Sequence, residues 1–86
     1  MPSKRTVFQQ VVTKSASHET RREAVRELGG MGAVEQLITL TETNGIDGPL
    51  RRLAVSELKK LSATEALETI SESRTVDPAI SEQAQL

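Results

Sequence analysis

Cysteine, tryptophan and tyrosine are absent from this 86-residue chain, and Phe8 is its only aromatic residue. Without cysteine the chain has neither disulfides nor thiolate metal sites. With one aromatic ring, the core must be built from Leu, Ile, Val, Ala and Met, and single-stranded nucleic acid finds almost no stacking platform. No apolar run approaches the roughly 20 residues of a membrane span, and no apolar segment marks a secretory signal. We therefore expect a cytoplasmic protein that makes no membrane contact.

An excess of charge of one sign is also lacking, because 11 basic and 12 acidic residues give a net charge of −1. This balance produces no overall attraction to nucleic acid or to an anionic membrane. A chain of this length forms one domain, residues 1–86, and buries only about 60–65% of its unfolded surface. The N-terminal 18 residues are basic and rich in Ser and Thr. They have two interpretations, an organellar targeting segment or an ordinary first helix, and the repeat described next favours the helix.

What the chain does contain is an internal repeat of 30 residues that needs no gap. Residues 17–47 align with residues 47–77, and the run Arg22–Leu28 (REAVREL) falls on Arg52–Leu58 (RLAVSEL). About a dozen identities in roughly 30 positions exceed what chance composition gives, and a period of this length is typical of stacked helical hairpins.

Each unit predicts two antiparallel helices. In the first unit Ser17 is a candidate N-cap, because its hydroxyl can accept a hydrogen bond from the first turn. The glycine-rich run 29–32 is expected to end the first helix and to reverse the chain. Asn44-Gly45 is expected to end the second helix.

The second unit carries similar helix-start patterns. Asp47 is the expected cap, with Pro49 in the first turn, where a missing N–H costs little. Asp77 is the corresponding cap one repeat later. Ser62-x-x-Glu65 matches a capping box and predicts the start of the next helix.

The sequence therefore predicts an all-α protein, an α-solenoid of about two and a half helical hairpins with five to six helices. Leu28 and Leu58 are expected to occupy its buried repeat position. The predicted units are a half repeat at 6–16, full repeats at 17–46 and 47–76, and a half repeat at 77–86.

The paired arginines and the R-x-x-A-V-x-x-L pattern that begins at Arg21 are similar to the short HEAT-like repeats of the bilin-lyase type. The likeness covers about residues 17–77. It implies an α-solenoid surface that binds other macromolecules, as in lyase subunits, nucleic-acid repair proteins and scaffolds that share such repeats. No functional residue of that family transfers to this chain, because the matched positions belong to the framework.

Residue patterns typical of catalysis or of cofactor binding are not found. His18 is the only histidine and lies at an expected helix start, without a second ligand nearby. The Gly29–Gly32 run follows a helix and lacks the Lys-Ser/Thr of a phosphate loop. Asp47 and Asp77 lie one full repeat apart, so capping explains them better than catalysis. We therefore expect no enzyme activity, no catalytic or metal-ligating residue and no cofactor.

The charges separate by helix and define two candidate surfaces. The first helix of each unit carries the candidate basic interaction surface, which comprises Arg21, Arg22, Arg51, Arg52, Lys59 and Lys60. The second helix carries the candidate acidic face, which comprises Glu35, Glu42, Glu65, Glu68 and Glu72. The alternative interpretation is two solvated faces with local ion pairs such as Glu23 with Arg26 and Glu57 with Lys60. The repeated arginine pair also has a structural interpretation, through contacts with helix ends or carboxylates.

The incomplete units at each end define the third candidate surface, end-face contacts through Phe8, Val11, Val12, Ile80 and Leu86. We hypothesise a non-catalytic module for protein–protein interaction or assembly, with self-association as its simplest form. One alternative is nucleic-acid binding through the basic face, which interleaved glutamates and the missing aromatics disfavour. Another is an accessory subunit of a lyase-like enzyme, which only the family resemblance supports.

Overall fold

Six α-helices make up most of the residues that the computed structural model describes, which are 3–43, 45–73 and 76–85. These helices are α1 (Lys4–Val12), α2 (His18–Gly30), α3 (Val34–Glu42), α4 (Gly48–Lys60), α5 (Thr64–Glu72) and α6 (Pro78–Ala84). The described residues include no β-strand, so the all-α prediction is confirmed.

The helix boundaries follow the 30-residue spacing of the sequence. α1, α3 and α5 begin at residues 4, 34 and 64 and end at residues 12, 42 and 72. α2 and α4 span 18–30 and 48–60, and α6 begins at residue 78. The expected N-terminal half repeat is therefore helical, although its helix begins two residues before the predicted boundary at residue 6.

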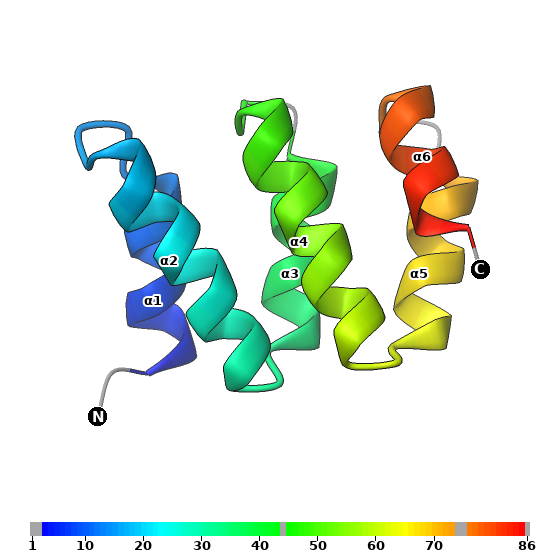
Figure 1. Ribbon diagram of the computed structural model, residues 1–86, viewed down its shortest axis with the longest axis horizontal. Coiled ribbons are helices and arrows are strands. Elements are labelled where there is room, and N and C mark those ends of the chain that lie inside the picture. Colours follow the sequence, from blue (N-terminus) through cyan, green and yellow to red (C-terminus); the bar gives the residue numbers. More distant parts are fainter. Residues whose placement is uncertain (1–2, 44, 74–75, 86) are drawn as a thin grey trace.

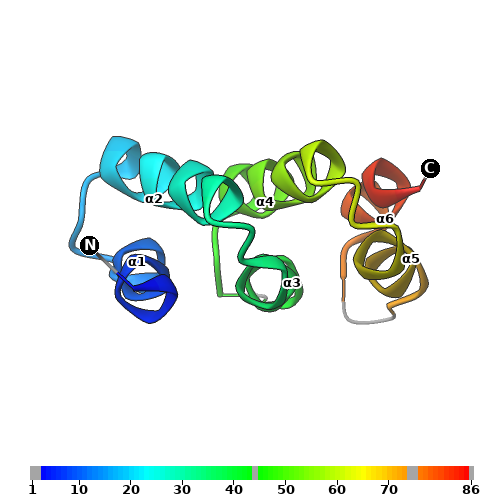
Figure 2. The same ribbon diagram turned by 90° about the horizontal axis from the view of Figure 1, so that it is seen from below.

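The helices form two layers (Figures 1 and 2). α2, α4 and α6 lie in one layer, and α1, α3 and α5 lie in the other. Within the first layer α2 packs on α4 and α4 packs on α6, and each helix of the second layer packs on the helix that follows it in sequence. The molecule measures 32 × 23 × 16 Å, and its two ends lie at opposite ends of the long axis.

The core between the layers is entirely aliphatic, as the composition requires. Leu28 and Leu58 are 0% exposed, as expected for the repeat position that they share. The largest fully buried side chains are Val7, Val11, Val25, Leu28, Leu37, Leu40, Leu50, Val55, Leu58, Leu67, Ile70 and Ile80. Burying one such side chain contributes about 1.5–3 kcal/mol relative to leaving it exposed, so this shared core holds the two layers together.

The expected caps differ in outcome. The Ser17 hydroxyl accepts a hydrogen bond from the backbone N–H of Thr20 at 3.1 Å, so this N-cap is confirmed. Asp47 and Asp77 lie at the N-cap positions of α4 and α6, but their side chains make no capping hydrogen bond. The predicted N-cap positions are therefore confirmed, but both carboxylates lie beside arginines of the preceding helix pair and do not bond the first turn.

The capping box at Ser62 is also wrong. Ser62 has a left-handed backbone with φ 55°, and α5 has Ala63 as its N-cap, with no side-chain hydrogen bond. Gly32, one repeat earlier, has φ 68°, so both reversals use the same left-handed residue. Glycine adopts this conformation without strain and serine does not, because its Cβ crowds the backbone.

α2 ends at Gly30, inside the predicted glycine-rich run. Gly29 is still helical, and Gly32 has the left-handed backbone of the reversal. Gly29 is buried so closely against Glu57 that a Cβ at this position would overlap the glutamate side chain. The glycine therefore allows α2 and α4 to approach closely. α3 ends at Glu42, and Asn44, half of the predicted stop, lies outside the described residues.

Candidate functional site

Two of the six candidate basic residues belong to the framework. Arg21 and Arg51 are 6% and 4% exposed. Arg21 Nε donates to the carbonyl oxygen of Val11 at 2.8 Å, and Arg51 Nε donates to that of Thr41 at 3.1 Å. Each arginine thereby satisfies a carbonyl at the C-terminal end of the preceding helix, where no intrahelical partner exists.

The same two arginines also connect neighbouring helix pairs. Arg21 Nη1 lies 3.7 Å from Asp47 Oδ2, and Arg51 Nη1 lies 3.5 Å from Asp77 Oδ2. Both carboxylates are more than half exposed, so these ion pairs stabilise less than the buried bonds to the carbonyls. The structural interpretation of these arginines is confirmed. Their assignment to an interaction surface is wrong, because a buried guanidinium that is already bonded cannot contact a partner.

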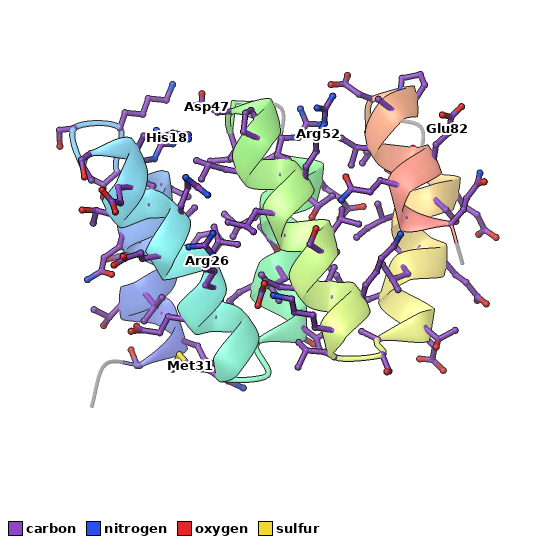
Figure 3. The ribbon with its side chains drawn as sticks, in the orientation of Figure 1. His18, Arg26, Met31, Asp47, Arg52 and Glu82 are labelled. Carbon is purple, nitrogen blue, oxygen red and sulfur yellow. The ribbon has the colours of Figure 1, made fainter. Side chains whose placement is uncertain are left out.

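The other four candidate basic residues lie at the surface of the α2/α4/α6 layer. Arg22, Arg52, Lys59 and Lys60 are exposed, and Lys60 pairs with Glu57 at 3.1 Å. One predicted local pair is thus present, whereas Glu23 and Arg26, both described, form no ion pair with each other. Figure 3 labels Arg52 on α4, and also Arg26 on α2, a further exposed cation of this layer. Arg22, Arg52 and Lys59 form no ion pair with another described residue, so they stay available to an anionic partner.

The five candidate acidic residues all lie on α3 and α5, in the opposite layer. Glu35, Glu65, Glu68 and Glu72 are exposed, and Glu42 is half-buried. Neither helix contains a basic residue. All charged residues of these two helices are therefore acidic.

Two of the five predicted end-face contacts are wrong. Val11 and Ile80 are 0% and 2% exposed, because both side chains point into the core. Phe8 is half-buried and Val12 is 36% exposed, so these two residues alone are accessible. Leu86 lies outside the described residues.

Polar residues occupy the outward side of the α1/α2 helix pair. Gln10 of α1 is exposed where α3 and α5 have the buried Leu40 and Ile70. Thr20 of α2 is likewise exposed where α4 has the buried Leu50. The apolar residue appears only where a preceding helix pair covers it. The outward side at the α1/α2 end is therefore polar and offers little apolar surface to a partner.

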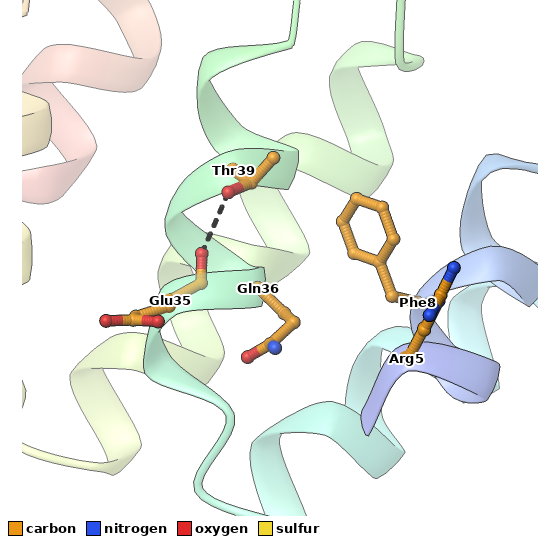
Figure 4. A pocket seen from close by; sticks show the side chains of 5 residues that line it. All are labelled: Arg5, Phe8, Glu35, Gln36 and Thr39. Carbon is orange, nitrogen blue, oxygen red and sulfur yellow. Dashed lines mark hydrogen bonds between the residues drawn. The ribbon is translucent and has the colours of Figure 1, made fainter. Parts of the chain in front are cut away.

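A hollow lies between α1 and α3 (Figure 4). This groove has a volume of about 430 Å³ and is lined by Arg5, Phe8, Glu35, Gln36 and Thr39. Phe8 and Arg5 form the α1 side, and Gln36 points toward them from α3. The only aromatic ring of the chain is therefore half-exposed in a groove with a cation on one side and polar groups on the other.

Of the lining residues, Phe8 and Glu35 are surface candidates from the sequence, whereas Arg5, Gln36 and Thr39 are not. A comparison of repeat positions would have found one of them. Gln36 stands where α5 has Ala66, and Ala66 is buried whereas Gln36 is only half-buried. A long polar side chain at the position where the next helix of the layer has a methyl group indicates that α1 and α3 do not pack closely there.

A second hollow, of about 360 Å³, lies at the end of α4. It is lined mainly by polar residues, namely Lys59, Ser62, Thr64 and Gln85, with Leu67.

The described part of the chain holds no group of three or more His, Asp or Glu side chains that could bind a metal ion. His18 is exposed at the first turn of α2 (Figure 3). Within the same residues, no helix is both long and apolar enough to span a bilayer.

Comparisons with protein-family models, with curated protein sequences and with solved structures find no match to this chain. Function is therefore inferred from the geometry of the surface.

Proposed function

We propose that this chain is a short α-solenoid of HEAT-like helical hairpins that binds another protein chain in the groove between α1 and α3. The helix boundaries at 30-residue intervals and the two-layer arrangement support the solenoid assignment. So does the arginine that bonds the preceding helix end and approaches the next aspartate in two successive hairpins. A cytoplasmic location stays a prediction from the sequence.

The half-exposed ring of Phe8 is the observation that carries the binding proposal. In a chain with so little aromatic content, the ring lies in the one junction of the α1/α3/α5 layer that stays open. Aromatic anchors in hollows are typical of the centre of protein interfaces. The surrounding Arg5, Gln36 and Thr39 supply hydrogen-bonding groups of the kind found at an interface rim.

The binding proposal predicts that a protein contacts the groove and not the opposite layer. A photo-crosslinking amino acid at Thr39, which lines the groove and is exposed, tests it in the cell that produces the chain. The matched control places the same group at Arg26 on the α2/α4/α6 layer. We expect a crosslinked protein, identified by mass spectrometry, from Thr39 alone, and we expect Phe8→Ala to remove it. Equal crosslinking from both positions, or none from Thr39, would refute the proposed site.

Nucleic-acid binding through the basic layer stays a prediction of lower rank. Arg21 and Arg51 are buried and bonded within the chain, so fewer exposed cations remain than the sequence implied. The exposed Glu19, Glu23 and Glu27 lie on the same helix as Arg22. No observation favours the third alternative, an accessory subunit of a lyase-like enzyme.

A further inference from the structure

We infer that the protein bound by the groove is a second copy of this chain, paired so that α1 of each copy lies along α3 of the other. This inference rests on the proposed function, because it names the partner of the same groove. Three observations carry it: the charges of α1 and α3, the level at which their residues stand, and the polar character of the other surfaces.

The two helices that line the groove carry opposite charges. α1 contains Lys4 and Arg5 and no acid, whereas α3 contains Glu35 and Glu42 and no base. None of the four forms an ion pair with any described residue, and Glu35 points away from Arg5 (Figure 4). The charges on the two sides of the groove are therefore complementary, yet they are not paired within one copy.

The repeat places these charges in matching register. Arg5 and Glu35 occupy equivalent positions of α1 and α3, and so do Phe8 and Ile38. α1 and α3 run side by side in the same direction, so equivalent residues stand at the same level (Figure 1). Consider a two-fold axis that is parallel to these helices and runs outside the molecule, along the open side of the groove. This axis puts α1 of one copy opposite α3 of the other. Arg5 then meets the partner copy's glutamate at position 35 and Phe8 meets its Ile38, each contact occurring twice.

Other surfaces offer no such self-complementarity. The outward side of α1 and α2 is polar, as Gln10 and Thr20 show. On α5, the exposed Glu68 replaces the apolar Phe8 and Ile38 of the equivalent positions, so its outer side cannot repeat this packing. The α2/α4/α6 layer carries exposed charges of both signs, among them Arg26 and Glu27, so it lacks the separation of charge that α1 and α3 have.

The area of the α1/α3 surface limits how tightly two copies can associate. A specific interface buries about 800 Å² per partner, which is roughly a sixth of the 5130 Å² that one copy exposes. α1 and α3 are only nine residues long each. We therefore expect a weak dimer that forms toward millimolar and dissociates toward micromolar concentration.

Sedimentation equilibrium of the purified full chain, from micromolar to millimolar concentration, tests the pairing through a charge exchange. Arg5→Glu alone and Glu35→Arg alone should each weaken dimerisation by about tenfold or more, because each places like charges opposite one another twice. An equimolar mixture of the two variants should restore the wild-type dimer, because every contact in the mixed dimer joins opposite charges. Phe8→Ala should weaken all of these dimers.

Arg26→Glu is the matched control, since it makes the same charge change at an exposed position of the opposite layer. It should leave the dimerisation constant unchanged, and circular dichroism should show that each variant keeps its helices. The pairing is overturned by a wild-type chain that stays monomeric at millimolar concentration, by a mixture that fails to restore the dimer, or by an equal effect of Arg26→Glu. A monomeric chain whose position 39 still crosslinks to a different protein would overturn the pairing and leave the proposed function standing.

Discussion

The junction between α1 and α3 is open, whereas the equivalent junction between α3 and α5 is closed. α3 packs on α5, but α1 has no comparable backbone contact with α3 and leaves the groove beside it. The facing residues explain the difference. Ala66 of α5 is small and buried, whereas Gln36 stands at the equivalent position of α3 and lines the groove with the larger ring of Phe8. One repeat framework thus supports both a closed core junction and an open groove.

The opposite layer shows that the groove is not caused by a general loosening at the α1 end. α2 and α4 approach closely where Gly29 packs against the Glu57 side chain. α1 is held to α2 by the buried Val7 and Val11 and by the bond from Arg21. The difference between the two junctions therefore arises from the side chains that face each other across the α1/α3/α5 layer.

The largest effect is expected in the core that both junctions share. Leu28→Asp and Leu58→Asp should each unfold the chain, because an unpaired buried carboxylate costs several kcal/mol in a domain of marginal stability. Loss of the helical circular-dichroism signal at 25 °C would show this. Leu61→Asp, at a residue that is 36% exposed on the end of α4, should stay helical. A folded Leu58→Asp variant would contradict the repeat register.

The framework arginines should matter equally at both junctions. Arg21→Ala and Arg51→Ala each remove a buried bond to a helix-end carbonyl, so each should lower the free energy of unfolding by about 2 kcal/mol. Urea denaturation measures this, with the exposed Arg22→Ala as the control. If Arg21→Ala costs much less than Arg51→Ala, then the α1 end is weakly held and the groove reflects a loose framework instead of local side chains.

Exchanging residues between the junctions should give the smallest effects and the sharpest comparison. Ala66→Gln forces a polar side chain into the closed junction and should lower the free energy of unfolding by about 1 kcal/mol or more. Gln36→Ala, on the half-buried side of the groove, should change it by less than about 0.5 kcal/mol. Thermal melts followed by circular dichroism compare the two. Equal effects would show that position 36 is packed as tightly as position 66.

Some of these features could be read from the sequence and others could not. The alignment of Arg22–Leu28 with Arg52–Leu58 placed both leucines in the core, and Ser17 was recognisable as an N-cap. The roles of Asp47 and Ser62 could not be read in this way. A capping motif depends on local backbone conformation, and tertiary contact or a left-handed turn overrode it at both positions.

The surface was harder to predict than the core. Periodicity tells which helix positions are apolar, but it cannot tell which side of a terminal helix has a neighbour. Val11 and Ile80 were therefore expected at the ends and are buried. Arg21 and Arg22 look alike in the sequence, yet only Arg21 points toward a helix end, so one is framework and the other is surface.

By itself, the sequence determined the helical class, the 30-residue spacing and the aliphatic core, because apolar periodicity and turn residues act over a few positions of the chain. The tertiary structure decided which charges are free and which junction stays open. Those properties depend on the distance between helices and on the volumes of side chains such as Phe8 and Gln36 that meet only after the layers have packed.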